Sequence, residues 1–148
     1  MSHYTLQKQD YSKLDKNISI AIITAQFNKD LTNQLETLNK EYLINEWFKN
    51  INTYQVPGAY EIPWMAKQLI DRKKTDLIIC LWVVIKWDTP HFDYVCAESA
   101  RWIMDLTTIS SIPIMNWILT CFSEKQVNER LKPVYALSGL NTLVAYNQ

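Results

Sequence analysis

The sequence predicts a single α/β domain in which a four-stranded parallel sheet carries helices on both faces. Short apolar runs alternate along the chain with longer segments whose apolar residues recur at helical spacing. These helical segments are long enough to return the chain to the starting edge of a sheet, which parallel strands require. One run, Leu77–Ile85, is apolar at every position, as expected for a central strand that is covered on both faces.

Four segments are expected to form the strands. The first has the sequence ISIAIIT, which is short, β-branched and without a helical period. The second is ended by Pro57-Gly58, a dipeptide that interrupts regular structure. In chain order, the expected strands span residues 18–24, 51–56, 76–85 and 112–120.

The amphipathic segments between and after these strands are expected to be helices. Asp30 stands where it can cap the first of them, and Pro133 is expected to stop the helix at 123–131. A last, short helix is expected at 141–146. The side chains expected to face the core are Leu31, Leu35, Leu38, Tyr42 and Leu43 in the first helix, Ile62, Met65, Ala66 and Leu69 in the second at 61–72, and Phe92, Val95, Cys96, Ser99 and Ile103 in the third at 92–106.

The charge balance of the chain argues against two classes of partner. Fifteen basic residues match fifteen acidic ones, whereas proteins that bind nucleic acid or a membrane surface usually carry a basic excess. The longest apolar run is also too short to span a bilayer. We therefore expect neither a nucleic-acid partner nor a membrane partner.

The cysteines indicate a reducing compartment. Cys80, Cys96 and Cys121 show no C-x-x-C spacing, so neither a disulfide framework nor a zinc site is expected. Residues 1–16 are polar and lack the apolar core of a signal peptide. A cytoplasmic protein with one domain, residues 1–148, is expected, in which 1–16 form a flexible N-terminal arm.

The chemically richest parts of the sequence follow the ends of expected strands. They are residues 25–28 (AQFN), 57–61 (PGAYE) and 86–93 (KWDTPHFD). Ligands of parallel α/β sheets bind beyond the carboxyl ends of the strands. These three segments are therefore expected to form a common site.

His91 is the residue of these segments best suited to acid–base chemistry. It stands at a helix start, where N–H groups and the positive end of the dipole suit a phosphate, and histidine exchanges protons near neutral pH. A capping or packing role for His91 is equally open at this point. Taken singly, Phe27 is more typical of a core residue, Glu61 of a carboxylate that complements a helix dipole, and Arg130 of a solvated cation.

Four segments resemble the 6,7-dimethyl-8-ribityllumazine synthase family in order and spacing. The second and third of these are too specific for a chance match, and the resemblance spans roughly residues 18–139. It implies one flavodoxin-like domain, a three-layer α/β sandwich. The matching segments are AQFN at 25–28, VPGAYEIP at 56–63, VIK at 84–86 followed by TPHFDYV at 89–95, and Leu119-Thr120 with Gln126 and Arg130 downstream.

The resemblance implies an enzyme that works without a cofactor or a metal. It would condense 5-amino-6-(D-ribitylamino)uracil with 3,4-dihydroxy-2-butanone 4-phosphate to 6,7-dimethyl-8-ribityllumazine, releasing phosphate and water. The substrates would be its small-molecule partners. An amine attacks the ketone, phosphate is eliminated, and the ring closes with loss of water.

Residue roles are implied at the matched positions. His91 would shuttle protons, and Phe27 would stack on the pyrimidine. The other substrate-binding positions are Ala59, Tyr60 and Glu61 for the ribityl chain, Val84 and Ile85 for the uracil, Asp88, Thr89 and Arg130 for the phosphate, and Asn116 at the edge of the uracil pocket.

The resemblance also implies a homo-oligomer, a pentamer, and in some members a shell of roughly 60 subunits. Asn116 and Arg130 of one subunit would face Phe27 and His91 of the next. Asn116 replaces the aromatic residue usual in the family, and Ser138 replaces a usual lysine. A catalytically impaired homologue that keeps the oligomer, or a binding module for a flavin or another phosphate ligand, are the alternatives.

Five tryptophans stand where this family has glycine, and the chain has only two glycines. Trp82 and Trp117 are expected to overpack buried strands, and Trp87 stands where the backbone must approach phosphate. Trp47 and Trp102 complete the set. We hypothesise that all five stand at UGA codons that the source organism reads as glycine, with genuine divergence as the alternative. UGG codons at these positions would contradict the hypothesis.

Overall fold

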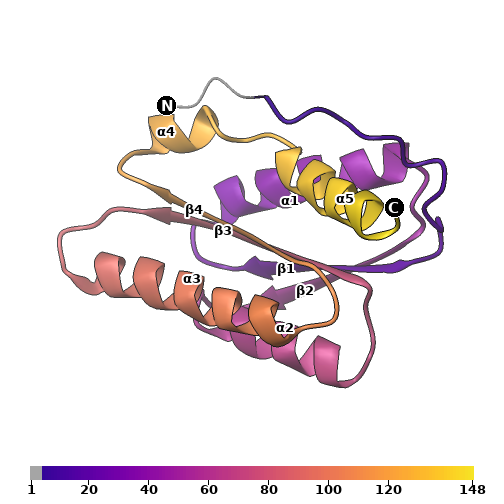
Figure 1. The fold of residues 1–148 in the computed structure, drawn as a ribbon. Helices are drawn as coiled ribbons and strands as arrows, with labels where there is room; N and C mark the ends of the chain where they lie inside the picture. The colour runs from indigo at the N-terminus through magenta and orange to yellow at the C-terminus, as the bar shows by residue number, and fades with distance from the viewer. Residues whose placement is uncertain (1–4) are drawn as a thin grey trace.

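The computed structural model describes residues 5–148 and has alternating strands and helices up to its last two helices (Figure 1). The four strands and the helices between them lie where the sequence predicts them, within two or three residues at most ends. In chain order the elements are β1 (Ser19–Ala25), α1 (Lys29–Asn45), β2 (Asn50–Val56), α2 (Glu61–Asp71), β3 (Leu77–Ile85), α3 (His91–Ile109), β4 (Ile114–Cys121), α4 (Glu124–Asn128) and α5 (Val134–Tyr146).

The sheet is parallel throughout and has the strand order β2-β1-β3-β4. The chain steps from β1 to β2 on one side and then crosses to β3 on the other side of β1. The strand order therefore reverses between β1 and β3. This reversal leaves a crevice at the carboxyl ends of β1 and β3, which is where α/β sheets of this kind bind ligands.

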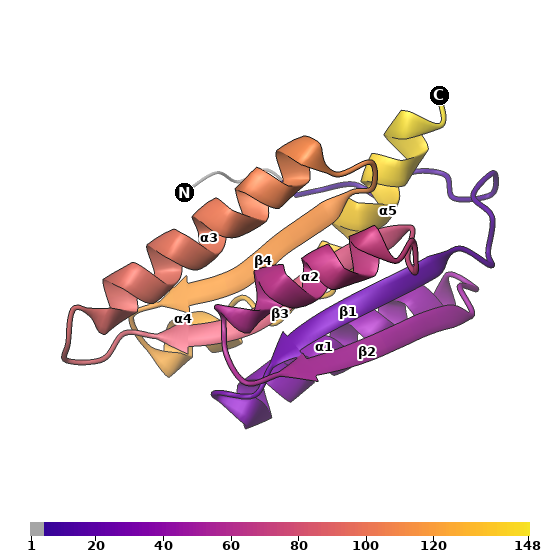
Figure 2. The same ribbon diagram turned by 90° about the horizontal axis from the view of Figure 1, so that it is seen from below.

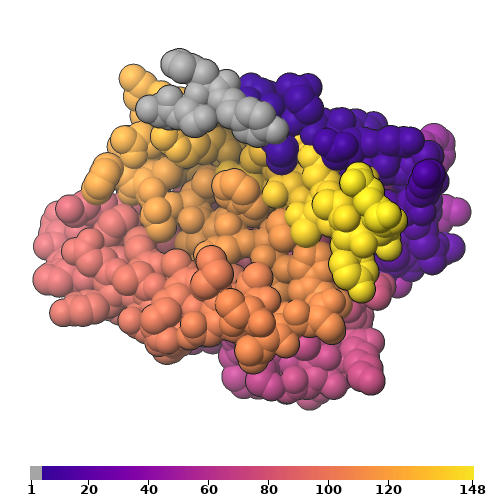
Figure 3. All heavy atoms as spheres, in the orientation of Figure 1, coloured from indigo at the N-terminus to yellow at the C-terminus, as the bar shows by residue number. Residues whose placement is uncertain are grey.

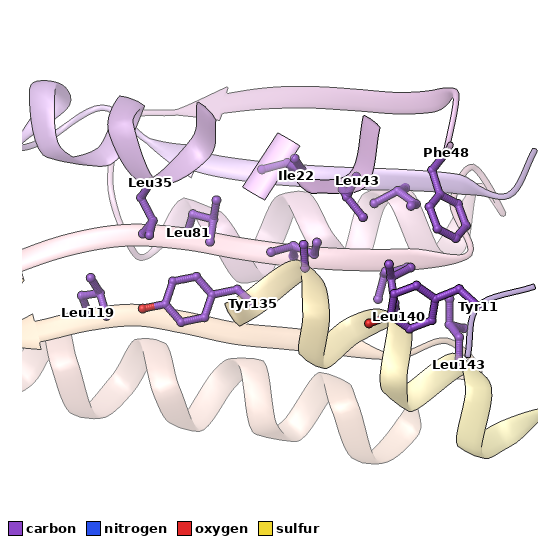
Figure 4. Close-up of a cluster of buried hydrophobic side chains, with 14 of the residues drawn as sticks. Tyr11, Ile22, Leu35, Leu43, Phe48, Leu81, Leu119, Tyr135, Leu140 and Leu143 are labelled. Carbon is purple, nitrogen blue, oxygen red and sulfur yellow. The ribbon is translucent and has the colours of Figure 1, made fainter. Parts of the chain in front are cut away.

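Helices cover both faces of the sheet, as predicted. Helices α1 and α5 pack on one face, and α2 and α3 on the other (Figures 1 and 2). Figure 4 shows part of the first core, where leucines of α1 and α5 meet the apolar side chains of β1, β3 and β4. Within residues 5–148, none of the helices combines the length and the apolar character needed to cross a membrane.

The segment expected to be a flexible arm packs against the body of the protein from Gln7 onward. Tyr11 and Leu14 are buried in the first core. The side chain of Asn141 in α5 accepts hydrogen bonds from the Gln9 N–H and the Tyr11 hydroxyl and donates one to the Gln7 carbonyl. In Figure 3 this indigo segment lies against the yellow helix α5.

Several helix boundaries differ from the sequence prediction. The N-cap residue of α1 is Asn28, and Asp30 lies in the first turn, so the capping role predicted for Asp30 is wrong. Pro133 does not stop the helix predicted at 123–131, because α4 already ends at Asn128. It is instead the N-cap residue of α5, which begins at Val134 rather than near Asn141. The fixed φ of proline suits the start of a helix, and its missing N–H costs nothing there.

The C-terminal end of α1 has the geometry of a glycine-ended helix. Trp47 adopts a left-handed backbone with φ of 69°. Its N–H donates to the Ile44 carbonyl at 2.9 Å, and the Phe48 N–H donates to the Leu43 carbonyl at 3.1 Å, which together make a Schellman motif. Glycine is the usual residue at this position because it has no Cβ. Lys73 ends α2 in the same way with φ of 50°, so the motif also tolerates other residues.

Trp47→Gly is expected to stabilise the protein by about 1 kcal/mol, because it removes the left-handed strain while losing few contacts. Trp47 is 74% exposed. Trp64→Gly is the matched control, since Trp64 is also exposed but lies inside α2. That change should destabilise the protein by roughly 0.5 kcal/mol. Urea unfolding of both variants checks the prediction, and two changes of the same sign would contradict it.

Candidate active site

A cavity of about 700 Å³ lies at the carboxyl edge of the sheet, at the reversal between β1 and β3. The three segments that the sequence analysis singled out all contribute to its wall. Its lining residues are Phe27, Asn28, Gly58, Ala59, Tyr60, Glu61, Trp82, Ile85, Lys86, Trp87, His91 and Val95. The wall is thus mainly apolar and aromatic, with one acidic and two basic side chains.

Six of the residues expected in a site meet in this cavity. They come from four places in the chain that the parallel topology brings to one edge: the end of β1, the β2–α2 turn, the end of β3 and the start of α3. The six are Phe27, Ala59, Tyr60, Glu61, Ile85 and His91.

Phe27 presents its ring to the cavity rather than to the core. Phe27 is 65% exposed, which excludes the core role that is more typical of a phenylalanine after a strand. Gly58 lets the β2–α2 turn come close to it. A Cβ at Gly58 would lie 3.7 Å from the Phe27 ring and 3.2 Å from the Glu61 carboxylate oxygen Oε2. The absence of a side chain at Gly58 therefore allows an aromatic face and a carboxylate to converge.

His91 is the first residue of α3, and its side chain is exposed at the rim. Its ring lies beside the Trp87 indole, with 5.8 Å between the ring centroids. Trp87 also packs edge-on against Phe92 at 5.9 Å, which ties the loop to the helix. Asp88 and Thr89 lie in this exposed loop, next to the helix start but outside the cavity lining. The loop and the N-terminus of α3 together offer amides and a positive dipole end to an anion.

Three expected site residues lie elsewhere within the single chain. Val84 is fully buried in the core between the sheet and α2 and α3. Asn116 is exposed on the edge strand β4. Arg130 follows α4, where it donates to the Gln126 carbonyl at 2.8 Å and lies 3.6 Å from Glu129. None of the three lines the cavity of its own chain.

The structure adds Trp82, Asn28 and Lys86 to the expected set. Trp82 is only 3% exposed, and its indole Nε1 donates to the Phe27 carbonyl at 3.1 Å. The indole is thus buried, as expected, and borders both the core and the cavity. Trp117 is likewise accommodated, since it is half-buried and packs on Tyr135 with 4.3 Å between ring centroids. Nothing in the pattern of residues indicates the direction of these side chains.

The cysteines are not arranged for nucleophilic chemistry. Cys80 is fully buried in β3, and burial raises the pKa of its thiol to about 12. Burial and the nearby charge of Asp93 raise the pKa of Cys96 to about 11. Both thiols therefore stay protonated at neutral pH. In the described part of the chain, no group of three or more histidine, cysteine or acidic side chains is placed to hold a metal ion.

Comparison with known proteins shows which family this chain is similar to. A family model described as 6,7-dimethyl-8-ribityllumazine synthase matches residues 17–142. A protein of that name from Limosilactobacillus reuteri is 40% identical over 115 residues, covering 78% of this chain and 76% of the relative. Another from Campylobacter jejuni subsp. jejuni is 40% identical over 119 residues, covering 79% and 77%. The matched range includes every segment that lines the cavity.

Proposed function

Since the chain belongs to the 6,7-dimethyl-8-ribityllumazine synthase family, we propose that its cavity is the active site for that reaction. It condenses 5-amino-6-(D-ribitylamino)uracil with 3,4-dihydroxy-2-butanone 4-phosphate to 6,7-dimethyl-8-ribityllumazine, releasing phosphate and water. The enzyme is a transferase of riboflavin synthesis. The observation that supports this site most strongly is the meeting of Phe27, Glu61 and His91 around one cavity at the strand ends.

The ribitylaminouracil has an aromatic ring and a polyhydroxyl chain, and the two parts of the cavity wall match them. The exposed ring of Phe27 offers a stacking surface for the pyrimidine. Ile85 lies at the end of β3, beside Val84, and lines the uracil side. Ala59, Tyr60 and Glu61 border the ribityl chain, and the Glu61 carboxylate accepts hydrogen bonds from its hydroxyls.

In the proposed complex, the phosphate of the second substrate binds at the start of α3. Backbone N–H groups at Asp88 and Thr89, the Thr89 hydroxyl and the helix dipole bind the anion. Arg130 supplies the counter-charge from an adjacent subunit. These donors stabilise the negative charge as phosphate leaves.

The chemistry then needs protons to move between bound groups. The uracil amine attacks the ketone, water is lost from the adduct, phosphate is eliminated, and the second nitrogen closes the ring with loss of water. His91, at the rim between the ring side and the phosphate side, accepts and returns these protons. Holding the two substrates together provides a further large part of the rate. The reaction requires no change of oxidation state, so the proposal includes no cofactor.

The complete site requires more than one subunit. Asn116 and Arg130 do not reach the cavity of their own chain, so a neighbour has to bring them there. We propose a homo-oligomer, a pentamer or a shell of pentamers, in the cytoplasm. Nucleic acid and membranes are not part of the proposed function.

A direct assay of product tests the proposed function. Purified protein with both substrates should form lumazine and phosphate in equal amounts, followed by absorbance and by phosphate release. Omission of either substrate should abolish both signals. The alternative is that the protein is a catalytically impaired homologue. It is suggested by Trp82 and Trp87, because their indoles form part of the cavity wall. Absence of product from the chain with glycine at all five tryptophan positions, as well as from the tryptophan chain, would contradict the proposal.

A further inference from the structure

The corner between β1 and α1 has an unusual backbone. Asn28 is the N-cap residue of α1 and adopts the left-handed conformation, with φ of 52° and ψ of 44°. Its side chain makes no capping bond to the helix. Phe27, immediately before it, has its ring uncovered at the cavity. The direction of that ring is therefore set by the backbone of the corner rather than by packing.

The side chain of Asn28 bonds instead to β3. Its Nδ2 donates to the Val83 carbonyl at 2.8 Å. The pairing of β1 with β3 ends at Thr24 and Leu81, while β3 continues to Ile85. The Asn28 amide thus supplies, at Val83, the hydrogen bond that β1 would have provided had it continued. Because the acceptor is a backbone carbonyl, this hydrogen bond can form whether position 82 is tryptophan or glycine.

A second set of bonds holds the Phe27 carbonyl. It accepts from the Thr32 hydroxyl at 3.2 Å and from the Trp82 indole at 3.1 Å. The peptide that connects Phe27 and Asn28 is therefore fixed by α1 on one side and by β3 on the other. Only the Phe27 ring remains uncovered.

We propose that Asn28 is a positioning residue that aims the Phe27 ring at the pyrimidine substrate. The inference rests on the proposed function of the cavity. Two properties of asparagine are needed at once: tolerance of the left-handed backbone, and an N–H donor of the right length. Glycine has the first property without the second. Aspartate keeps the size, but its carboxylate faces the Val83 carbonyl without a proton to donate.

Asn28→Gly is the variant that separates the hydrogen bond from the backbone conformation. It keeps the positive φ but loses the bond to Val83. KM for ribitylaminouracil is expected to rise roughly threefold to tenfold, the worth of one hydrogen bond. KM for the butanone phosphate and kcat should stay within about twofold of wild type. Asn28→Asp should raise KM for the uracil at least as much.

Lys73→Gly is the matched control, because Lys73 also has a positive φ but lies at the far end of α2, outside the cavity. It should leave both KM values unchanged. An unchanged KM for the uracil in Asn28→Gly, or a parallel change in both KM values and kcat, would overturn the proposal.

Amide hydrogen exchange without ligand provides a test that does not need activity. Residues 25–32 should exchange faster in Asn28→Gly than in wild type and Lys73→Gly. Unchanged exchange would overturn the positioning role whatever the kinetics show. A wild type that exchanges slowly here but makes no lumazine would instead count against the proposed function alone.

Discussion

His91→Ala is expected to lower kcat for lumazine formation by about a hundredfold, the usual loss when a general acid–base is removed. Amine addition, loss of water, phosphate elimination and ring closure each move a proton. Histidine is the residue type that takes up and releases protons near neutral pH, and His91 is the one histidine of the described chain, residues 5–148. Its side chain is exposed, so the substitution should leave the free energy of unfolding nearly unchanged.

His91→Gln is the matched control, because it keeps a hydrogen-bonding side chain that does not titrate. Loss of rate in both variants, together with loss of the pH dependence of kcat, identifies proton transfer as the role. A full rate in His91→Ala would remove the residue from the mechanism and leave substrate proximity as the source of catalysis. The measurement should be made with tryptophan and with glycine at position 87, since the Trp87 indole packs beside His91.

Arg130→Ala is expected to raise KM for the butanone phosphate roughly tenfold to a hundredfold, because a charge-assisted bond to phosphate is lost. KM for the uracil should change little. Within residues 5–148, Arg130 is partly exposed, and its guanidinium donates to the nearby Gln126 carbonyl and lies 3.6 Å from Glu129. Such surface contacts contribute little to stability, so the protein should unfold at a similar urea concentration. An unchanged KM for the phosphate substrate would refute the role.

A mixing experiment shows whether Arg130 acts across a subunit boundary. His91→Ala and Arg130→Ala subunits, disassembled and reassembled together, should regain activity at about a quarter of the sites, since each site draws its two halves at random. Unmixed assemblies provide the baseline. Activity that stays at the average of the two variants would show that Arg130 and His91 do not meet between subunits.

The strands and the strand-end site were predictable because each depends on local chemistry and simple topology. The run at Leu77–Ile85 could only be a central strand, and parallel strands must bring their ends to one edge. The inner face predicted for α3 was right at Phe92, Val95, Ser99 and Ile103, while Cys96 is only half-buried. These features follow from periodicity alone.

The remaining features depend on tertiary context. Helix α5 is apolar around most of its circumference, so its first half has no amphipathic stripe from which a helix could be predicted. A proline is compatible with the end of one helix as well as with the start of the next, so Pro133 did not show where α5 begins. The direction of the Trp82 indole depends on the cavity beside it. Asn116 and Arg130 do not line the cavity of their own chain, and their proposed meeting with it would depend on the placement of a second subunit, which the pattern of one chain does not contain.

The most direct test of the central claim, that this cavity is the active site, is a crystal structure with an unreactive ribitylaminouracil analogue and inorganic phosphate. The pyrimidine should stack on Phe27, with the ribityl chain along Ala59–Glu61. Phosphate should lie at the start of α3 with Arg130 of an adjacent subunit beside it. A ligand seated away from these residues, or a neighbouring subunit that fills the cavity with its own side chains, would contradict the account.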